Sequence, residues 1–293
     1  MQQLTAETFD QNARAALKDP VLHRALRNLA DNFVGRRKNA MSSVDDWEGL
    51  REKARAIKEE TLLHLDEYLL QFVENAEKAG ANIHWARDGK EACQIVIDLV
   101  KKRDARMVVK AKSMAGEEIH LNEALERSGI EPVETDLGEW IIQLAGETPS
   151  HIVVPAIHKT KEQIADIFVE KVGIEKTDNV DVLTKTTRRI LRERFAEAEV
   201  GISGVNFGVA ETGTILILEN EGNIRLTTSL TKTHIAVMGI EKVIPKFADL
   251  DVFLKLLPRS GTGQRLTAYQ SLITGVKKNA ADAGPEDVHI VLM

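Results

Sequence analysis

Short apolar segments with strand character alternate with amphipathic helical segments from Gly80 onward, and this alternation constrains the fold more than any other feature. Strands joined by crossover helices form βαβ units, whose strands pair in parallel and whose helices cover both faces of the sheet. The expected strands are 83–85, 106–110, 132–134 and 151–154, and the expected helices are 89–103, 115–128, 140–144 and 161–171. The sequence therefore predicts an α/β fold with a mainly parallel sheet and flanking helices.

A helix expected over 180–197 leads into a segment that is rich in strands and poor in helix. Short turns containing glycine and asparagine separate these strands, which favours antiparallel pairing. The expected strands are 200–205, 214–219, 223–228 and 234–238, followed by a helix at 247–256 and strands at 268–274 and 288–293. The α/β fold is thus expected to carry an antiparallel portion. Because the final apolar strand has no polar tail behind it, we also expect the chain to be cut from a longer protein.

The first 80 residues are predicted to be an N-terminal helical extension, followed by an α/β domain over 81–293. From Trp47 to Ala76, apolar residues recur at steps of mostly three and four, with Ser43 suited to cap the start and Gly80 to end the helix. Such a helix of about 34 residues would be a rod about 50 Å long. We expect this rod either to cross the main domain or to pack in a homo-oligomer.

Composition favours a cytoplasmic chain without nucleic-acid or membrane partners. The net charge of −6 gives no general attraction to polyanions, although it leaves room for a local basic pocket. No apolar run approaches the roughly 20 residues that span a bilayer, and the N-terminus lacks the features of a signal peptide. Cys93 is the single cysteine, and the eight histidines form no zinc motif, so no disulfide and no metal site is expected.

Two expected strand ends carry a lysine beside a hydroxyl group where a helix begins. Lys112 and Ser113 follow the strand at 106–110, and Lys159 and Thr160 follow the strand at 151–154. Thr160 and Gln163 also have the spacing of a capping box. A lysine charge, a hydroxyl donor and free helix amides together suit a carboxylate or a phosphate. The alternative is ordinary capping beside a solvated lysine.

A glycine-rich segment at 201–214 is the second candidate for ligand contact. It lacks the glycine spacing of dinucleotide-binding loops and is expected to connect strand to strand. Glycines allow a backbone to approach a ligand closely, although a purely structural turn uses them as well. The candidate binding residues are Asn206, Thr212, Gly213 and Thr214, with Glu211 as a candidate acid–base group.

The third candidate is an expected hairpin at 219–225, followed by a polar segment. Its polar residues are Asn220, Glu221, Gly222 and Arg225, and Lys232 and His234 come shortly after. Gly222 tolerates a positive φ, so a tight turn alone explains much of this segment.

Several segments taken together resemble the LUD family of lactate-utilization proteins. They are 201–214, 220–225 and 232–242, with Lys112–Met114, Glu117–Asn122 and Glu134–Glu139, and the similarity runs from about residue 10 to the end. The resemblance implies the fold of the sugar-phosphate isomerase and CoA-transferase group. It also implies a role in L-lactate oxidation to pyruvate, carried out with other lactate-utilization proteins as partners.

Members of this family continue into a ferredoxin-like part with [4Fe–4S] clusters. This chain lacks those cysteine motifs, so clusters are expected only in a C-terminal part outside it, and no cofactor is expected in the chain itself. The resemblance brings no catalytic residue set.

The chemistry of the residues suggests roles in binding a small carboxylate such as lactate or pyruvate. Lys112 or Lys159 would bind the carboxylate, and Glu211, His158 or His234 would accept the hydroxyl proton. We therefore expect Lys112, Lys159 and Glu211 to share a single pocket. Two alternatives remain open: acyl transfer through Glu219 or Glu221, as in CoA transferases, and a non-catalytic scaffold for partner subunits.

Overall fold

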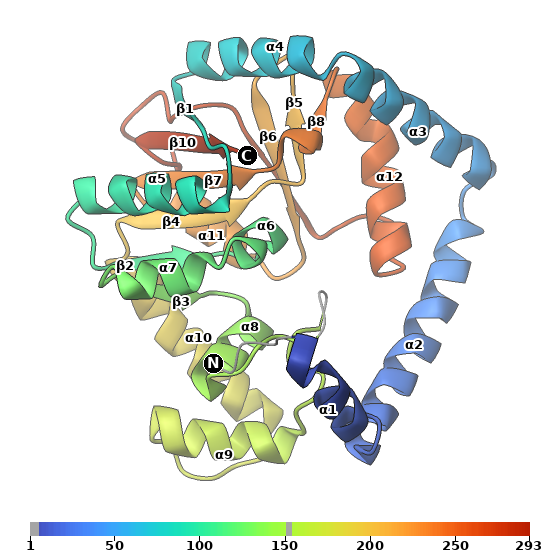
Figure 1. Ribbon diagram of the computed structural model, residues 1–293, viewed down its shortest axis with the longest axis vertical. Helices are drawn as coiled ribbons and strands as arrows, with labels where there is room; N and C mark the ends of the chain where they lie inside the picture. The colour runs from blue at the N-terminus through green and yellow to red at the C-terminus, as the bar shows by residue number, and fades with distance from the viewer. Residues whose placement is uncertain (1–5, 151–153) are drawn as a thin grey trace.

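The structure is a computed structural model that describes residues 6–150 and 154–293. Within these ranges the strands form a six-stranded sheet in the order β1-β10-β7-β4-β2-β3 and a four-stranded sheet in the order β8-β5-β6-β9 (Figure 1). The protein therefore has the α/β architecture that its sequence predicts.

The larger sheet is parallel at every pairing between neighbouring strands. Its strands in spatial order are β1 (Ala81–Trp85), β10 (Asp287–Leu292), β7 (Thr233–Met238), β4 (Val200–Gly204), β2 (Met107–Lys110) and β3 (Glu131–Glu134). All six residues of β7 are buried, as expected for a central strand covered on both faces. The expected strands at 106–110, 132–134 and 288–293 are confirmed.

Helices and the smaller sheet cover the two faces of the parallel sheet. On one face, α5 (Gly89–Lys102) and α7 (Leu121–Arg127) pack against the sheet through apolar side chains such as Val96 and Leu125. On the other face, α4 (Leu65–Lys78) and the smaller sheet cover β1, β10 and β7. Near the β3 edge, α8 (Leu137–Ala145), α9 (Lys161–Val172) and α10 (Val180–Glu197) form a further apolar cluster.

The smaller sheet accounts for the antiparallel portion. It consists of β8 (Val243–Ile244), β5 (Phe207–Val209), β6 (Thr214–Glu219) and β9 (Tyr269–Ile273). β6 pairs antiparallel with both β5 and β9, whereas β5 and β8, two strands that were not predicted, are parallel. β4 and β7 join the parallel sheet instead, so the antiparallel expectation was wrong for these two strands.

The strand expected at 223–228 is wrong, because this segment forms helix α11 (Asn223–Ser229). The carboxylate of Glu219 accepts hydrogen bonds from the backbone N–H groups of Ile224 and Arg225, both at 2.7 Å, and so satisfies the free amides of the first turn. Gly222 enters the helix at φ +84°, a left-handed conformation that favours glycine. The β-branched residues of the segment suggested a strand, but the capping contacts determine a helix.

The continuous rod expected from Ser43 to Gly80 is also wrong. The segment forms α3 (Trp47–Leu63) and α4, which are separated at His64, where the backbone leaves the helical region at φ −124° and ψ 37°. α3 begins after Asp46, whose side chain accepts from the N–H of Gly49 at 2.8 Å, rather than at Ser43. Before it come α1 (Ala6–Ala16) and α2 (Pro20–Met41), which extend away from the sheets (Figure 1).

The remaining helices lie close to the positions expected from the sequence, although one expected helix is divided in two. The helix expected at 115–128 is divided into α6 (Met114–Glu118) and α7 because His120 has a left-handed backbone. A 3-10 turn, η1 (Ile240–Lys242), follows β7, and another, η2 (Phe247–Asp249), precedes α12 (Leu250–Gly261), which packs against α2 and α3.

Most of the strand expected at 151–154 falls on residues 151–153, which lie outside the described residues. In the described ranges, no helix combines the length and apolar character needed to cross a lipid bilayer.

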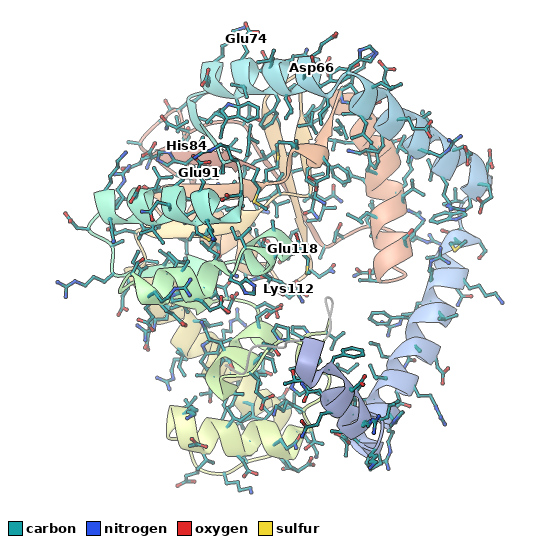
Figure 2. All side chains as sticks on the ribbon, viewed as in Figure 1. Asp66, Glu74, His84, Glu91, Lys112 and Glu118 are labelled. Atoms are coloured by element: carbon teal, nitrogen blue, oxygen red, sulfur yellow. The ribbon has the colours of Figure 1, made fainter. Side chains whose placement is uncertain are left out.

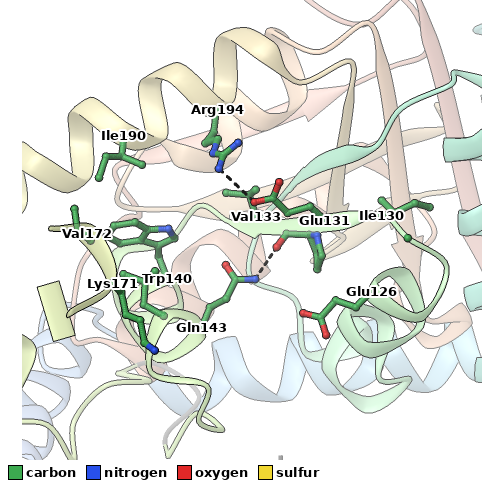
Figure 3. A pocket seen from close by; sticks show the side chains of 13 residues that line it. Glu126, Ile130, Glu131, Val133, Trp140, Gln143, Lys171, Val172, Ile190 and Arg194 are labelled. Atoms are coloured by element: carbon green, nitrogen blue, oxygen red, sulfur yellow. Dashed lines mark hydrogen bonds and ion pairs between the residues drawn. The ribbon is translucent and has the colours of Figure 1, made fainter. Parts of the chain in front are cut away.

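The outer edge of β3 is covered by a side chain rather than by another strand. Gln143 of α8 donates from Nε2 to the carbonyl of Pro132 at 2.6 Å and accepts at Oε1 from the N–H of Glu134 at 3.1 Å. Figure 3 shows this amide beside the strand, within a hollow of about 710 Å³ that Trp140 and Arg194 also line.

Candidate functional site

A cavity of about 1030 Å³ lies at the carboxyl ends of the parallel strands. Residues that follow five of these strands contribute to its lining: Arg87 after β1, Lys112 and Ser113 after β2, Gly204 at the end of β4, Gly239 after β7 and Met293 after β10. In open α/β sheets this edge is where ligands bind. The volume lies at the upper end of the range that is typical of ligand pockets.

The wall opposite the strand ends is apolar. It is formed by the smaller sheet, α11 and α12, with Val205 from the segment after β4, and its other apolar residues are Phe207, Ile217, Leu218, Ile224, Phe253 and Leu257. The ring centroids of Phe207 and Phe253 lie 4.7 Å apart and the ring planes are tilted by 35°, so two aromatic rings in contact line this side of the cavity.

Most charged groups in the lining already have partners. Asp88 caps α5 by accepting from the N–H of Glu91 at 2.9 Å, and Arg87 pairs with the Glu91 carboxylate at 2.9 Å. Lys242 pairs with Glu241 at 3.2 Å. Lys58 donates to the carbonyls of Glu241 and Val243, and burial lowers the pKa of its ammonium group.

Lys112 is a cation of the lining whose carboxylate partner is itself buried. Its side chain is 20% exposed, and its Nζ lies 3.3 Å from Oε1 of Glu139 on α8. Burial raises the pKa of the Glu139 carboxyl to about 7, although Lys112 acts in the opposite direction. Near neutral pH this carboxyl is therefore protonated in a substantial fraction of molecules, and the Lys112 charge is then free to attract an anion. Figure 2 marks Lys112 together with Glu118, which also lines the cavity.

A second, fully buried ion pair lies behind Lys112. Lys110 Nζ is 2.7 Å from Glu134 Oε1, and the same oxygen accepts from Asn122 Nδ2 at 2.8 Å. Burial also raises the pKa of the nearby Glu117 carboxyl. The end of β2, which Lys112 follows, is thus held in place by buried polar contacts.

Ser113 joins the cavity to the helix that follows. Its Oγ accepts from the N–H of Gly116 at 3.3 Å, so it caps α6 while lining the cavity. A Cβ at Gly204 would lie 2.5 Å from Ser113 Oγ, so β4 needs glycine at this position. The glycine therefore makes room for Ser113.

Of the residues predicted to bind a ligand, Lys112, Ser113 and Asn206 line this cavity. Asn206 also has a structural role, because its Oδ1 accepts from the N–H of Leu218 at 2.8 Å. Lys159 and Glu211 are not part of the lining, so the shared pocket expected for Lys112, Lys159 and Glu211 is not formed by this cavity.

The junction before α9 forms a separate polar cluster. Lys159 and His158 both bind the carboxylate of Glu147, His158 Nε2 at a distance of 2.8 Å. The side chains of Thr160 and Gln163 form the capping box that the sequence predicts. These contacts favour the structural interpretation of this junction, since each charge is satisfied by a neighbour.

The segment from Glu211 to Thr214 lies against α4. Glu211 Oε2 accepts from the N–H of Phe247 at 2.8 Å, and the hydroxyls of Thr212, Thr214 and Thr274 form a chain with distances of 2.8 and 2.7 Å. Gly213 has φ +64°, and a Cβ there would lie 2.2 Å from the backbone nitrogen of Ala76. The close approach that requires this glycine is therefore to α4.

The residues predicted around the hairpin support the start of α11 and the loop before β9. Asn220 Oδ1 accepts from Gln264 Nε2 and from the N–H of Ala268, both at 3.1 Å, and Glu221 Oε2 accepts from the N–H of Asn220 at 3.0 Å. Gly222 and Arg225 belong to the helix start described above. Glu219 is likewise engaged with two backbone amides, which is not the arrangement of a free nucleophile.

Two further predicted residues lie at the amino end of β7, away from the cavity. Lys232 pairs with Glu199 at 3.0 Å. His234 is completely buried, its Nε2 lies 2.8 Å from Ser203 Oγ, and burial lowers its pKa to about 4. The imidazole is therefore neutral at physiological pH and contacts no solvent.

The sequence interpretation missed Glu139 and the cations Lys58, Arg87 and Lys242. An available signal was the position of Glu139 directly before the apolar run Trp140–Ile142, where a helix start places an acid against the core. The three cations come from segments far apart in the chain, and the sequence gives no signal that groups them.

Comparison with known proteins identifies the family of this chain. The family model described as the LUD domain matches residues 69–293. The chain belongs to the LUD domain family. The match begins inside α4, so the LUD model includes most of the helix that packs on the sheet.

Similar curated proteins are longer than this LUD chain. Lactate utilization protein B from Shouchella clausii is 43% identical over 97% of the chain, which covers 60% of that protein. Lactate utilization protein B from Bacillus pumilus is 43% identical over 98% of the chain and 61% of that protein. The electron transport protein YkgF of Escherichia coli, itself described as uncharacterized, is 40% identical over 97% of the chain and 60% of that protein. The chain thus spans about 60% of the length of these relatives.

Among solved structures, a DUF162 family protein from Deinococcus radiodurans is similar at a TM-score of 0.40 and 13% identity. The similarity covers 78% of the LUD chain and 97% of the other.

Proposed function

We propose that this LUD domain is the ligand-binding part of a lactate-utilization protein and binds a small carboxylate of the lactate or pyruvate type in the cavity at the strand ends. The names of its relatives support the metabolic role. The observation that carries the proposal is Lys112, a cavity-lining cation whose partner Glu139 has a carboxyl pKa of about 7.

In this proposal the ligand carboxylate binds between Lys112 and Ser113. The Lys112 ammonium supplies a charge-assisted hydrogen bond, and the Ser113 hydroxyl, which already accepts from Gly116, donates its proton to the second carboxylate oxygen. Phe207 and Phe253 add apolar side chains to the lining of the same cavity. A charged contact is stronger where apolar groups lower the local dielectric constant.

In this proposal the domain binds the ligand, and electron transfer takes place in other parts of the longer protein. The proton acceptors expected from the sequence, Glu211, His158 and His234, are not among the residues that line the cavity. Oxidation of L-lactate to pyruvate, with any [4Fe–4S] clusters, is therefore proposed for the remaining part of the longer protein and its partner proteins.

The Lys112→Gln variant tests this proposal. Loss of a hydrogen bond to a charged group costs about 1.5–3 kcal/mol, which corresponds to roughly 10- to 100-fold weaker binding. Isothermal titration calorimetry with L-lactate and with pyruvate at pH 6 would measure this loss.

The matched control is Lys159→Gln, which removes the same charge outside the cavity lining. We expect its affinity to equal that of the wild type. Equal affinities for Lys112→Gln and the wild type would contradict the proposal, as would an effect of Lys159→Gln as large as that of Lys112→Gln.

A second candidate function is partner docking by the N-terminal helices. Several large apolar side chains are exposed there, namely Phe9, Leu17, Val34, Leu62, Leu63 and Leu70. Large exposed apolar surfaces mark protein interfaces, and these side chains are the basis of this second candidate. Light scattering on the chain alone, and then with each lactate-utilization partner protein, would distinguish self-association from hetero-association.

A further inference from the structure

A buried group of acids and lysines lies directly behind the cavity. Glu139 is 4% exposed and Lys110 and Glu134 are 1% and 4% exposed, so this group is shielded from solvent. Glu117 of α6 adds a further, half-buried carboxyl that acts on Glu139. Lys112 connects this group to the cavity, because it lines the cavity and contacts Glu139.

Three oxygens of this group are buried without a hydrogen-bond donor among the described residues. They are Glu139 Oε1, Glu134 Oε2 and Asn122 Oδ1. The 3.3 Å contact between Lys112 Nζ and Glu139 Oε1 is thus a charge contact without hydrogen-bond geometry. Buried acceptors of this kind are costly, and a carboxylate oxygen lowers that cost when it takes up a proton.

We propose that binding of a carboxylate ligand at Lys112 is coupled to the uptake of one proton by Glu139. This inference rests on the proposed function, because it requires an anion at Lys112. The ligand carboxylate neutralises the Lys112 charge, the Glu139 carboxylate then loses its compensating cation, and a proton from solvent adds to Glu139. No other bond forms or breaks.

The neighbouring charges favour this coupling. The negative charges of Glu134 on β3 and Glu117 on α6 disfavour ionisation of Glu139 and so raise its pKa. Lys110 compensates Glu134 at 2.7 Å. On the side of α9, Glu147 holds both Lys159 and His158. Lys112 is therefore the cation that stabilises ionised Glu139, and a bound anion competes directly with that role.

The coupling has a defined sign and range. The pKa of Glu139 is about 7 in the free protein and rises when an anion engages Lys112. Binding therefore favours the protonated form, so affinity is highest below pH 7 and decreases as the pH rises through 7. Between pH 6 and pH 8 the decrease is about tenfold, the change expected when one group with a pKa near 7 must be protonated.

The experiment is calorimetric titration of the full chain with pyruvate, which stays ionised throughout this range. Titrations at pH 6, 7 and 8, each in two buffers with different heats of ionisation, give both the affinity and the number of protons taken up. For the wild type we expect about tenfold weaker binding at pH 8 than at pH 6, with net proton uptake at pH 7 and above.

The Glu139→Gln variant fixes this side chain in a neutral form. We expect it to bind pyruvate with the same affinity at pH 6 and pH 8 and without proton uptake. The matched control, Glu193→Gln, changes an exposed acid on α10 and should retain the wild-type pH dependence. The proton count of the wild type tests the coupling even if the Glu139 variant does not fold.

The outcomes separate this inference from the proposed function. Absence of pyruvate binding at pH 6 would contradict the proposed function and, with it, the coupling. Binding that depends on Lys112 but takes up no proton, or pH dependence that persists in Glu139→Gln, would overturn the coupling alone.

Discussion

Replacement of Lys110 by methionine is expected to destabilise the fold by about 3–5 kcal/mol. Removal of one member of a buried ion pair leaves the other charge uncompensated, and such changes are strongly destabilising. Lys110 is 1% exposed, and its partner Glu134 would retain a single hydrogen bond to that oxygen, from Asn122. Urea unfolding followed by circular dichroism at pH 7 would measure the loss.

Two controls define the cause of this effect. The double variant Lys110→Met with Glu134→Leu removes both charges and should recover much of the lost stability, since apolar replacements of buried pairs are often neutral. Arg55→Met removes two exposed ion pairs, with Glu52 and Glu59, and should leave stability nearly unchanged. A double variant as unstable as Lys110→Met would show that packing, rather than charge, accounts for the loss.

The second large effect is expected for Phe72→Ala. Phe72 of α4 is fully buried against the face of the sheet formed by β1, β10 and β7. Truncation of a buried phenylalanine typically costs about 3–5 kcal/mol, because it removes apolar contacts and leaves a cavity. The same unfolding measurement applies, and we expect a single cooperative transition with a lower midpoint.

Leu70→Ala is the matched control on the same helix, because Leu70 is 67% exposed. We expect a change of about 0.5 kcal/mol or less. If both variants behaved alike, α4 would be a loosely attached extension and not part of the domain core.

The main fold could be predicted from the sequence because its strongest signals are local. The apolar strands at 106–110 and 288–293 alternate with amphipathic helices, and parallel pairing follows from that order. The Thr160 capping box could be read in the same way, since its residues lie three positions apart. The error at α11 has another cause: its first turn depends on hydrogen bonds from two backbone N–H groups to the Glu219 carboxylate, and residue types that favour strands do not reveal such a side-chain contact.

The site could be predicted in part for the same reason. Lys112 and Ser113 were found because they directly follow a strand, and strand ends meet at one edge of a parallel sheet. Glu139 offered only its position directly before an apolar run, because its raised pKa results from burial in the folded chain. Lys159, like Lys112, stands beside a hydroxyl residue before a helix, but it pairs with Glu147 and does not line the cavity.

The amide of Gln143 blocks one edge of the six-stranded sheet. An exposed sheet edge offers backbone groups on which strands of other molecules can assemble, and natural proteins block such edges. At β3 the glutamine occupies both the carbonyl of Pro132 and the N–H of Glu134, and proline itself has no N–H to offer. A side chain of α8 thus occupies the two outward-facing backbone groups with which a seventh strand would pair, and this border of the sheet is blocked.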